Sequence, residues 1–302
     1  MQRLRYVHTV FILFTMTTLS FSQADQLFPG DPAKNRCLLI LENAMKDSAD
    51  FFVSVHAAEA LIAHQDTMGI EKLFKTRLRE SDANRVGCYR VLAKLNGTGS
   101  AGSAFYIRRL KGILLNADIK KEKLIALESL AKLGFKEPLP VILQLAENGE
   151  AAFKSISRWI LANSGNAADE KRLTEMLTSD RPDDRLYAAY AFRFLKHMSH
   201  ENYAFLDSCT NRLDLSDPNR INFVCARYVH SDKEDEAKAK AAVLHYIDGN
   251  KEERYELAEA LSLRGSRADL PVLNKLLQDE SKDVRVAAAN AWLWINFKKS
   301  SI

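Results

Sequence analysis

The sequence is poor in the residues that interrupt helices. Only 7 prolines and 12 glycines occur among 302 residues, whereas alanine, leucine, lysine and glutamate are abundant. Proline breaks a helix and glycine weakens it, so their scarcity is typical of helices joined by short turns. It argues against a β-sandwich and against a disordered chain. We therefore expect an all-α protein.

Cysteine is also scarce, with Cys37, Cys88, Cys209 and Cys225 the four present. No two of them form the closely spaced pair of a structural zinc site, so we expect no metal. An even number in an exported chain permits two disulfides, and small buried thiols are the alternative. Cys209 and Cys225 flank the turn at 216–218 almost symmetrically, which predicts that they pair. Cys37 and Cys88 would then form the second pair.

Long apolar runs are missing as well. The longest candidate, residues 7–14, follows Arg3 and Arg5 and is too short to cross a bilayer, which needs roughly 20 apolar residues. A basic start, a short apolar segment and small residues after it are typical of a cleaved export signal. We expect a signal over 1–24 and a mature chain over 25–302 in the periplasm or outside the cell. An uncleaved signal anchor is the alternative.

Neither sign of charge dominates. The formal net charge is +4, and it falls to +2 without residues 1–24 because Arg3 and Arg5 are removed. Lysine and arginine alternate with aspartate and glutamate along the whole chain, whereas a nucleic-acid-binding protein normally has a basic stripe. We expect no nucleic-acid partner.

What the sequence does contain is an internal repeat. Its template begins at Arg285, with apolar or small residues at positions +1, +3, +4, +6 and +7, and the same pattern returns at Arg185. The eight anchors of the pattern are residues 54, 85, 123, 154, 185, 220, 254 and 285. On a helix, positions +3, +4 and +7 share one face, so each copy predicts an amphipathic helix. Positions +2, +5 and +9 face away from that stripe.

A second helical pattern lies between successive copies, and glycines such as Gly134 and Gly165 separate the helices where a left-handed residue is wanted. Each unit is therefore predicted to be a helical hairpin. A hairpin this short cannot bury both of its apolar stripes alone, so the units must stack. We expect one α-solenoid of about eight hairpins over 25–302, in which each unit contacts only its neighbours in the sequence.

The segment 261–289, with Leu270, Leu273, Leu276 and the run from Asp283 to Ala289, resembles a HEAT repeat of the short type found in phycobilisome bilin lyases. The resemblance is strongest over 252–295 and is also present over 170–195. It implies an α-solenoid that acts as a protein-binding scaffold. Similar repeats also accompany exported hydrolases, so an enzyme or an enzyme accessory, bilin-lyase-like or carbohydrate-linked, is the alternative.

No motif points to catalysis. The glycines of 97–102 match a dinucleotide-binding pattern, but the segment before them is predicted to be a helix where that site needs a strand. His197 and His200 lack the carboxylate or cysteine partners of a metal site. We therefore expect no cofactor and no enzymatic activity.

The candidate binding site lies on the predicted concave side. Aromatic and apolar residues concentrate at the outward positions of the middle repeats, and exposed aromatic patches usually contact a partner. The residues expected to line the groove are Ile156, Trp159, Tyr187, Tyr190, Phe194, Glu256 and Glu259. Ordinary packing between repeats is the alternative. We expect a monomer that binds a protein or peptide in this groove.

Overall fold

The computed structural model describes residues 31–297, and this part of the chain contains sixteen α-helices, three short 3-10 helices and no strand. The predicted all-α class is therefore confirmed. The predicted export signal over 1–24 lies outside the described residues. None of the helices between residues 31 and 297 is both long enough and apolar enough to cross a membrane.

The chain divides into two compact units, Met1–Arg36 and Cys37–Ile302. The structure describes the first unit only from Asp31 onward, where α2 (Pro32–Lys46) begins. All other helices belong to the second unit.

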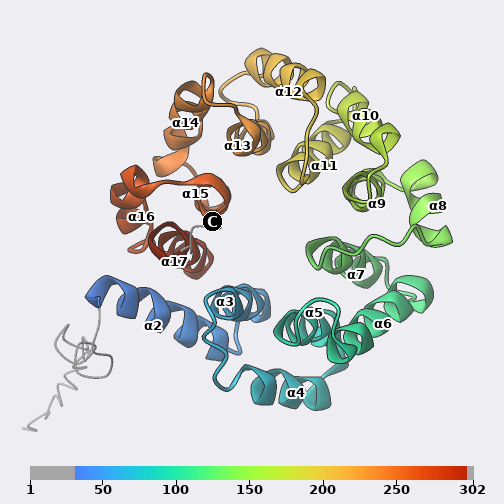
Figure 1. The fold of residues 1–302 in the computed structure, drawn as a ribbon, viewed down its shortest axis with the longest axis vertical. Helices are drawn as coiled ribbons and strands as arrows, with labels where there is room; N and C mark the ends of the chain where they lie inside the picture. The colour runs from blue at the N-terminus through green and yellow to red at the C-terminus, as the bar shows by residue number, and fades with distance from the viewer. Residues whose placement is uncertain (1–30, 298–302) are drawn as a thin grey trace, which may run out of the picture. The chain divides into compact units, whose positions relative to one another are not determined.

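Eight helices of the second unit form a closed circuit, in which each helix packs against the next and α17 packs against α3. They lie on the inside in Figure 1 and are called the inner helices here. The inner helices are α3 (Phe51–Ala63), α5 (Arg85–Leu95), α7 (Lys120–Lys132), α9 (Ala151–Asn163), α11 (Pro182–Arg193), α13 (Arg220–His230), α15 (Lys251–Arg264) and α17 (Lys282–Phe297). Each of them contains one anchor of the sequence repeat.

The remaining helices of this unit alternate with the inner helices along the chain and lie outside them in Figure 1. These outer helices are the part of α2 from Cys37 onward, α4 (Ile70–Glu80), α6 (Ala101–Asn116), α8 (Pro140–Asn148), α10 (Ala167–Met176), α12 (His200–Arg212), α14 (Glu236–Leu244) and α16 (Leu270–Leu276). The short 3-10 helices are η1 (Asp82–Asn84), η2 (His245–Asp248) and η3 (Arg267–Asp269). Helices α6 and α10 each pack against both flanking inner helices.

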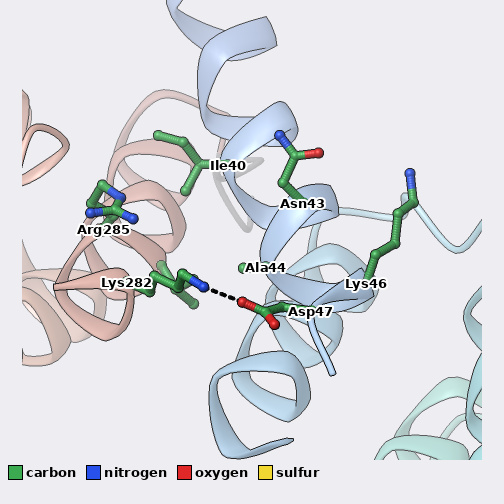
Figure 2. A pocket seen from close by; sticks show the side chains of 8 residues that line it. Ile40, Asn43, Ala44, Lys46, Asp47, Lys282 and Arg285 are labelled. Atoms are coloured by element: carbon green, nitrogen blue, oxygen red, sulfur yellow. Dashed lines mark hydrogen bonds and ion pairs between the residues drawn. The ribbon is translucent and has the colours of Figure 1, made fainter. Parts of the chain in front are cut away.

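The contact between α17 and α3 corrects one expectation. Units were predicted to touch only their neighbours in the sequence, yet the His64 ring Nε2 lies 3.2 Å from Asn290 Oδ1, and Lys282 forms an ion pair with Asp47. Figure 2 shows this ion pair at the edge of a cavity of about 490 Å³ between α2 and α17. The first and last inner helices are therefore neighbours. A repeat pattern in the sequence predicts contacts between adjacent units and does not predict this one.

Local signals in the sequence set the helix ends. Asp50 accepts the Val53 amide at 3.2 Å and caps α3, while Asn250 and Glu253 form a reciprocal capping box at the start of α15. Gly134 and Gly165 adopt φ of 72° and 100° after α7 and α9. Side chains rarely tolerate this left-handed conformation, so glycine ends these helices at low cost.

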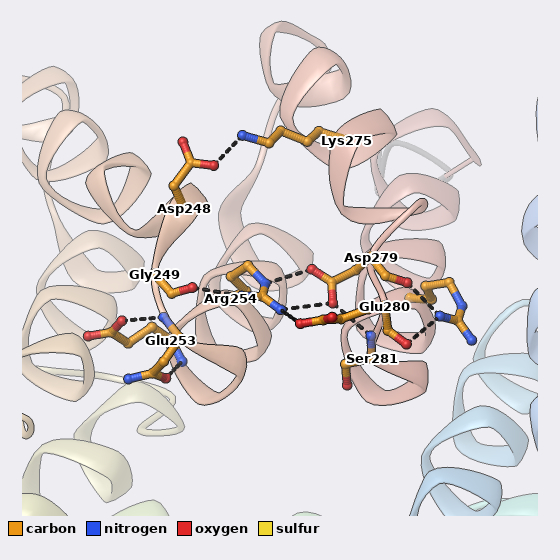
Figure 3. A network of polar contacts seen from close by, with 10 residues as sticks. Asp248, Gly249, Glu253, Arg254, Lys275, Asp279, Glu280 and Ser281 are labelled. Carbon is orange, nitrogen blue, oxygen red and sulfur yellow. Dashed lines mark hydrogen bonds and ion pairs between the residues drawn. The ribbon is translucent and has the colours of Figure 1, made fainter.

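The arginine anchors of the repeat have a structural role. Arg185 Nη1 donates to the Ser179 carbonyl at 2.8 Å, and Arg285 Nη1 donates to the Asp279 carbonyl at 2.5 Å. In both cases the acceptor lies six residues earlier, in the turn that leads into the inner helix. Arg254 extends the pattern to the next hairpin, with bonds of 2.6 and 3.1 Å to the Asp279 carboxylate (Figure 3). These three arginines therefore tie α11, α15 and α17 to the turns beside them.

Some inner helices, such as α9 and α13, are buried over most of their length, because each is enclosed by two inner neighbours and by outer helices. Ten of the thirteen residues of α9 are buried. The motif at 97–102 covers the turn after α5 and the first two residues of α6, so the strand that a dinucleotide site requires does not precede it.

Candidate functional site

A cavity of about 360 Å³ lies where the C-terminal ends of the inner helices converge. Every inner helix except α13 contributes to it, through its own residues or those that directly follow it. The lining residues are His56, Glu59, Ala60, Ala63, Lys94, Ala131, Lys132, Gly134, Trp159, Asn163, Phe194, Lys196, Tyr255, Glu259, Leu263, Asn290 and Trp294. We call this space the central cavity.

Charged side chains at or near the central cavity form ion pairs between inner helices. The Arg90 guanidinium lies 2.9 Å from Glu59, which lines the cavity, and Arg193 forms an ion pair with Glu256. Both arginines are about 3% exposed. A buried guanidinium without a carboxylate would be costly, so these pairs hold the inner helices in one arrangement.

A second polar group joins α7 to α11. The Tyr190 hydroxyl donates to Glu128 at 2.6 Å, and Lys132 lies 3.0 Å from the same carboxylate. Arg193 stacks over the Tyr190 ring, with its guanidinium carbon 5.3 Å from the ring centroid. A cation over an aromatic face is attracted by the negative face of the ring. Tyr190 is therefore held both by a hydrogen bond from its hydroxyl and by the stacking of its ring.

The charges around the central cavity shift the pKa values of its acidic groups in opposite directions. Burial raises the pKa of Glu59, but Arg90 and the lysines beside it outweigh that effect and lower it to about 2. The pKa of Glu259 is raised, first because burial disfavours the carboxylate and then because Glu256 and Glu59 add negative charge nearby. Glu59 therefore stays ionised, whereas Glu259 binds a proton more readily than an ordinary glutamate.

His56 is neutral at ordinary pH. Burial lowers its pKa to about 4, and the positive charges of Lys132 and Arg90 act in the same direction. Its ring stacks on Tyr255, with the centroids 6.1 Å apart, and its Nδ1 has no hydrogen-bond partner within the described residues. His56 therefore offers the cavity an uncharged polar ring.

The aromatic residues predicted to form an exposed patch are packed together instead. Ile156 and Trp159 are each 3% exposed and belong to the hydrophobic core, so the prediction that they are surface residues is wrong. Trp159 stacks on Phe194 with centroids 5.0 Å apart, and Tyr190 meets Phe194 edge-on at 5.1 Å. The circuit of inner helices is narrow enough that outward positions of neighbouring helices pack on each other.

The other predicted groove residues are half-buried. Tyr187 lies on α11, and Glu256 is held by Arg193. Of the seven predicted residues, the structure brings Trp159, Phe194 and Glu259 to the central cavity. The groove prediction therefore named the correct helices but only part of the lining.

Most of the lining residues that sequence reasoning missed follow a simple rule. Seven lining residues stand nine positions after an anchor, and all of them except Phe194 were missed. The seven are Ala63, Lys94, Lys132, Asn163, Phe194, Leu263 and Trp294. Position +9 is one of the three positions predicted to face away from the apolar stripe, so reading that column along the array would have identified the cavity.

Neither predicted disulfide is formed, because Cys88, Cys209 and Cys225 are free buried thiols. Cys225 donates its thiol to the Glu256 carbonyl at 3.5 Å, so it points toward α15 and not toward Cys209 on α12. Burial raises the pKa of Cys88 and of Cys225 to about 12, which keeps both protonated and unreactive. The symmetric spacing about the turn at 216–218 did not reveal that the Cys225 side chain points away from Cys209.

The part of the chain between residues 31 and 297 contains no group of three or more His, Cys, Asp or Glu side chains arranged to hold a metal ion.

No family model matches this chain, and no curated protein matches it. Among solved structures, the chain is similar to two crystal structures of engineered proteins. The first is 19% identical with a TM-score of 0.31, over 87% of this chain and 78% of the other. The second is 16% identical with a TM-score of 0.22, over 88% of this chain and 97% of the other. Similarities this distant say nothing about function, and the central cavity has to be interpreted from its own residues.

Proposed function

We propose that this protein is an exported, non-catalytic binding protein that holds a short peptide segment of a partner in the central cavity. The proposal rests on one observation: Trp159 and His56 line this cavity, and the buried Trp159 Nε1 and His56 Nδ1 have no hydrogen-bond partner among the described residues. Buried polar groups are nearly always satisfied, so an unsatisfied donor at a cavity wall suits a ligand that supplies its partner.

The same proposal includes the architecture. We propose an α-solenoid of about eight HEAT-like hairpins that acts as a monomer. Support comes from the anchors of the sequence repeat, each of which lies on its own inner helix, and from Arg185 and Arg285, which make the same bond to a carbonyl six residues earlier.

The size of the cavity limits the ligand. About 360 Å³ lies in the range of roughly 300 to 1,000 Å³ that is common for small-ligand sites. A folded domain does not fit between inner helices that contact one another, whereas a few residues of an extended peptide do. The partner would therefore insert an end or a short segment.

Acid–base catalysis on the bound ligand is a second candidate. It is favoured by Glu59 and Glu259, two carboxyl groups on one cavity whose pKa values are moved apart. Such a pair can supply a base and an acid at one pH. The two candidates differ in the fate of the ligand, which leaves a binding protein intact and leaves an enzyme cleaved.

A cavity-filling variant tests the proposal. Ala63 is half-buried on the cavity wall, so Ala63→Trp should fill the space, while Ala104→Trp on the exposed side of α6 is the matched control. Proteins and peptides captured from the host's extracellular fraction should be retained by the wild type and the control, and lost by Ala63→Trp at an unchanged melting temperature. Equal capture by all three would refute a central site, and peptides recovered in cleaved form would favour catalysis.

A further inference from the structure

The chemistry of the ligand can be inferred from the polar groups that the central cavity leaves without partners. The ammonium groups of Lys94 and Lys196 have no ion pair or hydrogen bond among residues 31–297, and both side chains are exposed at the cavity mouth. Trp159 also lines the cavity; it is 3% exposed, and its buried indole Nε1 has no acceptor in the same part of the chain. All three groups donate hydrogen bonds and cannot accept them.

The acceptors of the cavity are largely occupied. Glu59 is bound by Arg90 at 2.9 Å, and Asn163 Oδ1 accepts the Lys196 amide at 2.9 Å. Burial raises the pKa of Glu259, so this group carries its negative charge less readily than an ordinary glutamate. A ligand that satisfies this cavity must therefore bring acceptors, and the two ammonium groups select a negative charge.

Lysines near helix C-termini also have a simpler explanation. The carbonyl ends of the inner helices converge at the cavity, and cations such as Lys94 in the last turn of α5 offset their partial negative charge. That explanation accounts for the lysines but not for the buried Trp159 N–H. The same converging carbonyls, together with the ionised Glu59, disfavour a doubly charged anion such as phosphate. A single charge fits better.

Part of the wall is apolar. Ala60, Ala63, Ala131, Leu263 and the Trp294 ring line the cavity beside these donors. A ligand with its charge at one end and an apolar group next to it would use both surfaces, since the burial of apolar area favours binding.

We propose that the central cavity binds the carboxyl terminus of a peptide whose last residue is apolar, with Lys94 and Lys196 on the carboxylate, Trp159 as a buried donor, and the alanines, Leu263 and Trp294 around the side chain. This inference rests on the proposed function and specifies its ligand. Capture of a terminal carboxylate is a known mode of peptide recognition in general.

The test uses pools of acetylated tetrapeptides with three random residues followed by Leu, prepared either as the free acid or as the carboxamide. A third pool ends in Ser as the free acid. We expect the free-acid Leu pool to bind the full-length protein at least about tenfold more tightly than the carboxamide pool, because only the free acid carries a negative charge for the two ammonium groups. The Ser pool should bind more weakly than the Leu pool.

Two variants locate the effect. Lys94→Met with Lys196→Met should reduce the affinity for the free acid to that for the carboxamide and leave the carboxamide unchanged. The control, Lys72→Met with Lys171→Met, removes the same charge from exposed positions on outer helices and should bind as the wild type does. Melting temperatures of both should match the wild type.

The outcomes separate the two proposals. Equal binding of free acid and carboxamide, lost in Ala63→Trp, would overturn the carboxylate inference and leave the peptide-binding function in place. If neither pool binds the wild type more tightly than Ala63→Trp, both proposals fail. Equal loss of free acid and carboxamide in the lysine variant would also overturn the inference, because a charge contact affects only the free acid.

Discussion

Buried charged residues help to select how the helices pack against one another. Arg90, Arg158, Arg193 and Arg227 are at most 5% exposed. Each lies within 3 Å of a carboxylate, which belongs to Glu59, Asp169, Glu256 and Asp207 respectively. Paired in this way, buried ions add little net stability, but a misplaced helix would leave a guanidinium unpaired at a cost of several kcal/mol. These pairs therefore select one arrangement of the helices over its alternatives.

His56 should make stability depend on pH. Its folded pKa of about 4 lies below the ordinary 6.5, so below pH 6.5 the unfolded chain binds a proton that the folded chain refuses. This contribution is complete above pH 6.5 and is lost as the pH falls toward 4. The full pKa shift corresponds to about 3 kcal/mol in the free energy of unfolding. We expect a loss of about 2 kcal/mol, because the side chain is still 26% exposed and solvent weakens the effect.

His56→Gln should remove this part of the pH dependence. Free energies of unfolding in urea at pH 7 and pH 5 should differ less in the variant than in the wild type. Glu59 and Glu128, with pKa values of about 2, lose their contributions only below pH 4.5, outside this window. An unchanged pH slope in His56→Gln would show that the ring is hydrated in the folded protein.

The sequence indicated the helices of these residues but not their partners. Arg193 meets Glu256, 63 residues later, and Tyr190 meets Glu128, 62 residues earlier. Both distances skip a whole hairpin, so no periodicity of neighbouring repeats reveals them. Trp159 was misassigned for a related reason: helical periodicity shows which face is apolar, but not whether the opposite face meets solvent or another helix.

At the scale of the element, two arginine anchors hold the turns that precede α11 and α17. Arg185 and Arg285 bind carbonyls of the preceding turn, and Arg285 also reaches the Glu280 carbonyl at 2.9 Å. Carbonyls of a tight turn have no helical partner, and a guanidinium with several donors can satisfy two of them at once. The anchor arginine therefore stabilises the turn before the helix. The sequence pattern alone presented it only as the first polar residue of a helix.

Removing an anchor should destabilise the protein without affecting the cavity. Arg185→Met and Arg285→Met should each lower the free energy of unfolding by about 1–2 kcal/mol, the usual cost of losing charged hydrogen bonds to otherwise unpaired carbonyls. Arg108→Met, at an exposed position of α6, should change it by less than about 0.5 kcal/mol. Urea denaturation followed by circular dichroism measures all three. Equal, small effects would show that water replaces the anchors.

The elements themselves were the most predictable part of the fold. All eight anchors lie on separate inner helices, and the glycines at 134 and 165 have the positive φ expected of helix ends. These features depend on residues within about ten positions of each other. The disulfides were not predictable in this way, because the direction of Cys225 depends on α15, a helix of the following hairpin.

For the second unit as a whole, the decisive feature is the contact between α3 and α17. It joins hairpins more than 200 residues apart, with Asn290 beside His64, Asp283 Oδ1 3.9 Å from His56 Nδ1, and Trp294 edge-on to His64 at 5.3 Å. Without this contact, the cavity would lack the wall formed by Asn290 and Trp294. The central cavity therefore depends on closure of the circuit, and closure depends on polar contacts whose partners no local pattern specifies.

Charge reversal at the junction should test this dependence. Asp47→Lys would place a second positive charge next to Lys282 and loosen the contact of α17 with α3. The other inner helices should stay packed. Hydrogen exchange measured by mass spectrometry should rise in α3 and α17 and remain unchanged in α9. Asp47→Lys combined with Lys282→Asp restores opposite charges and should return exchange to the wild-type pattern. Faster exchange in α9 to the same extent would show that the circuit opens as one cooperative unit and that the junction is no weaker than its other contacts.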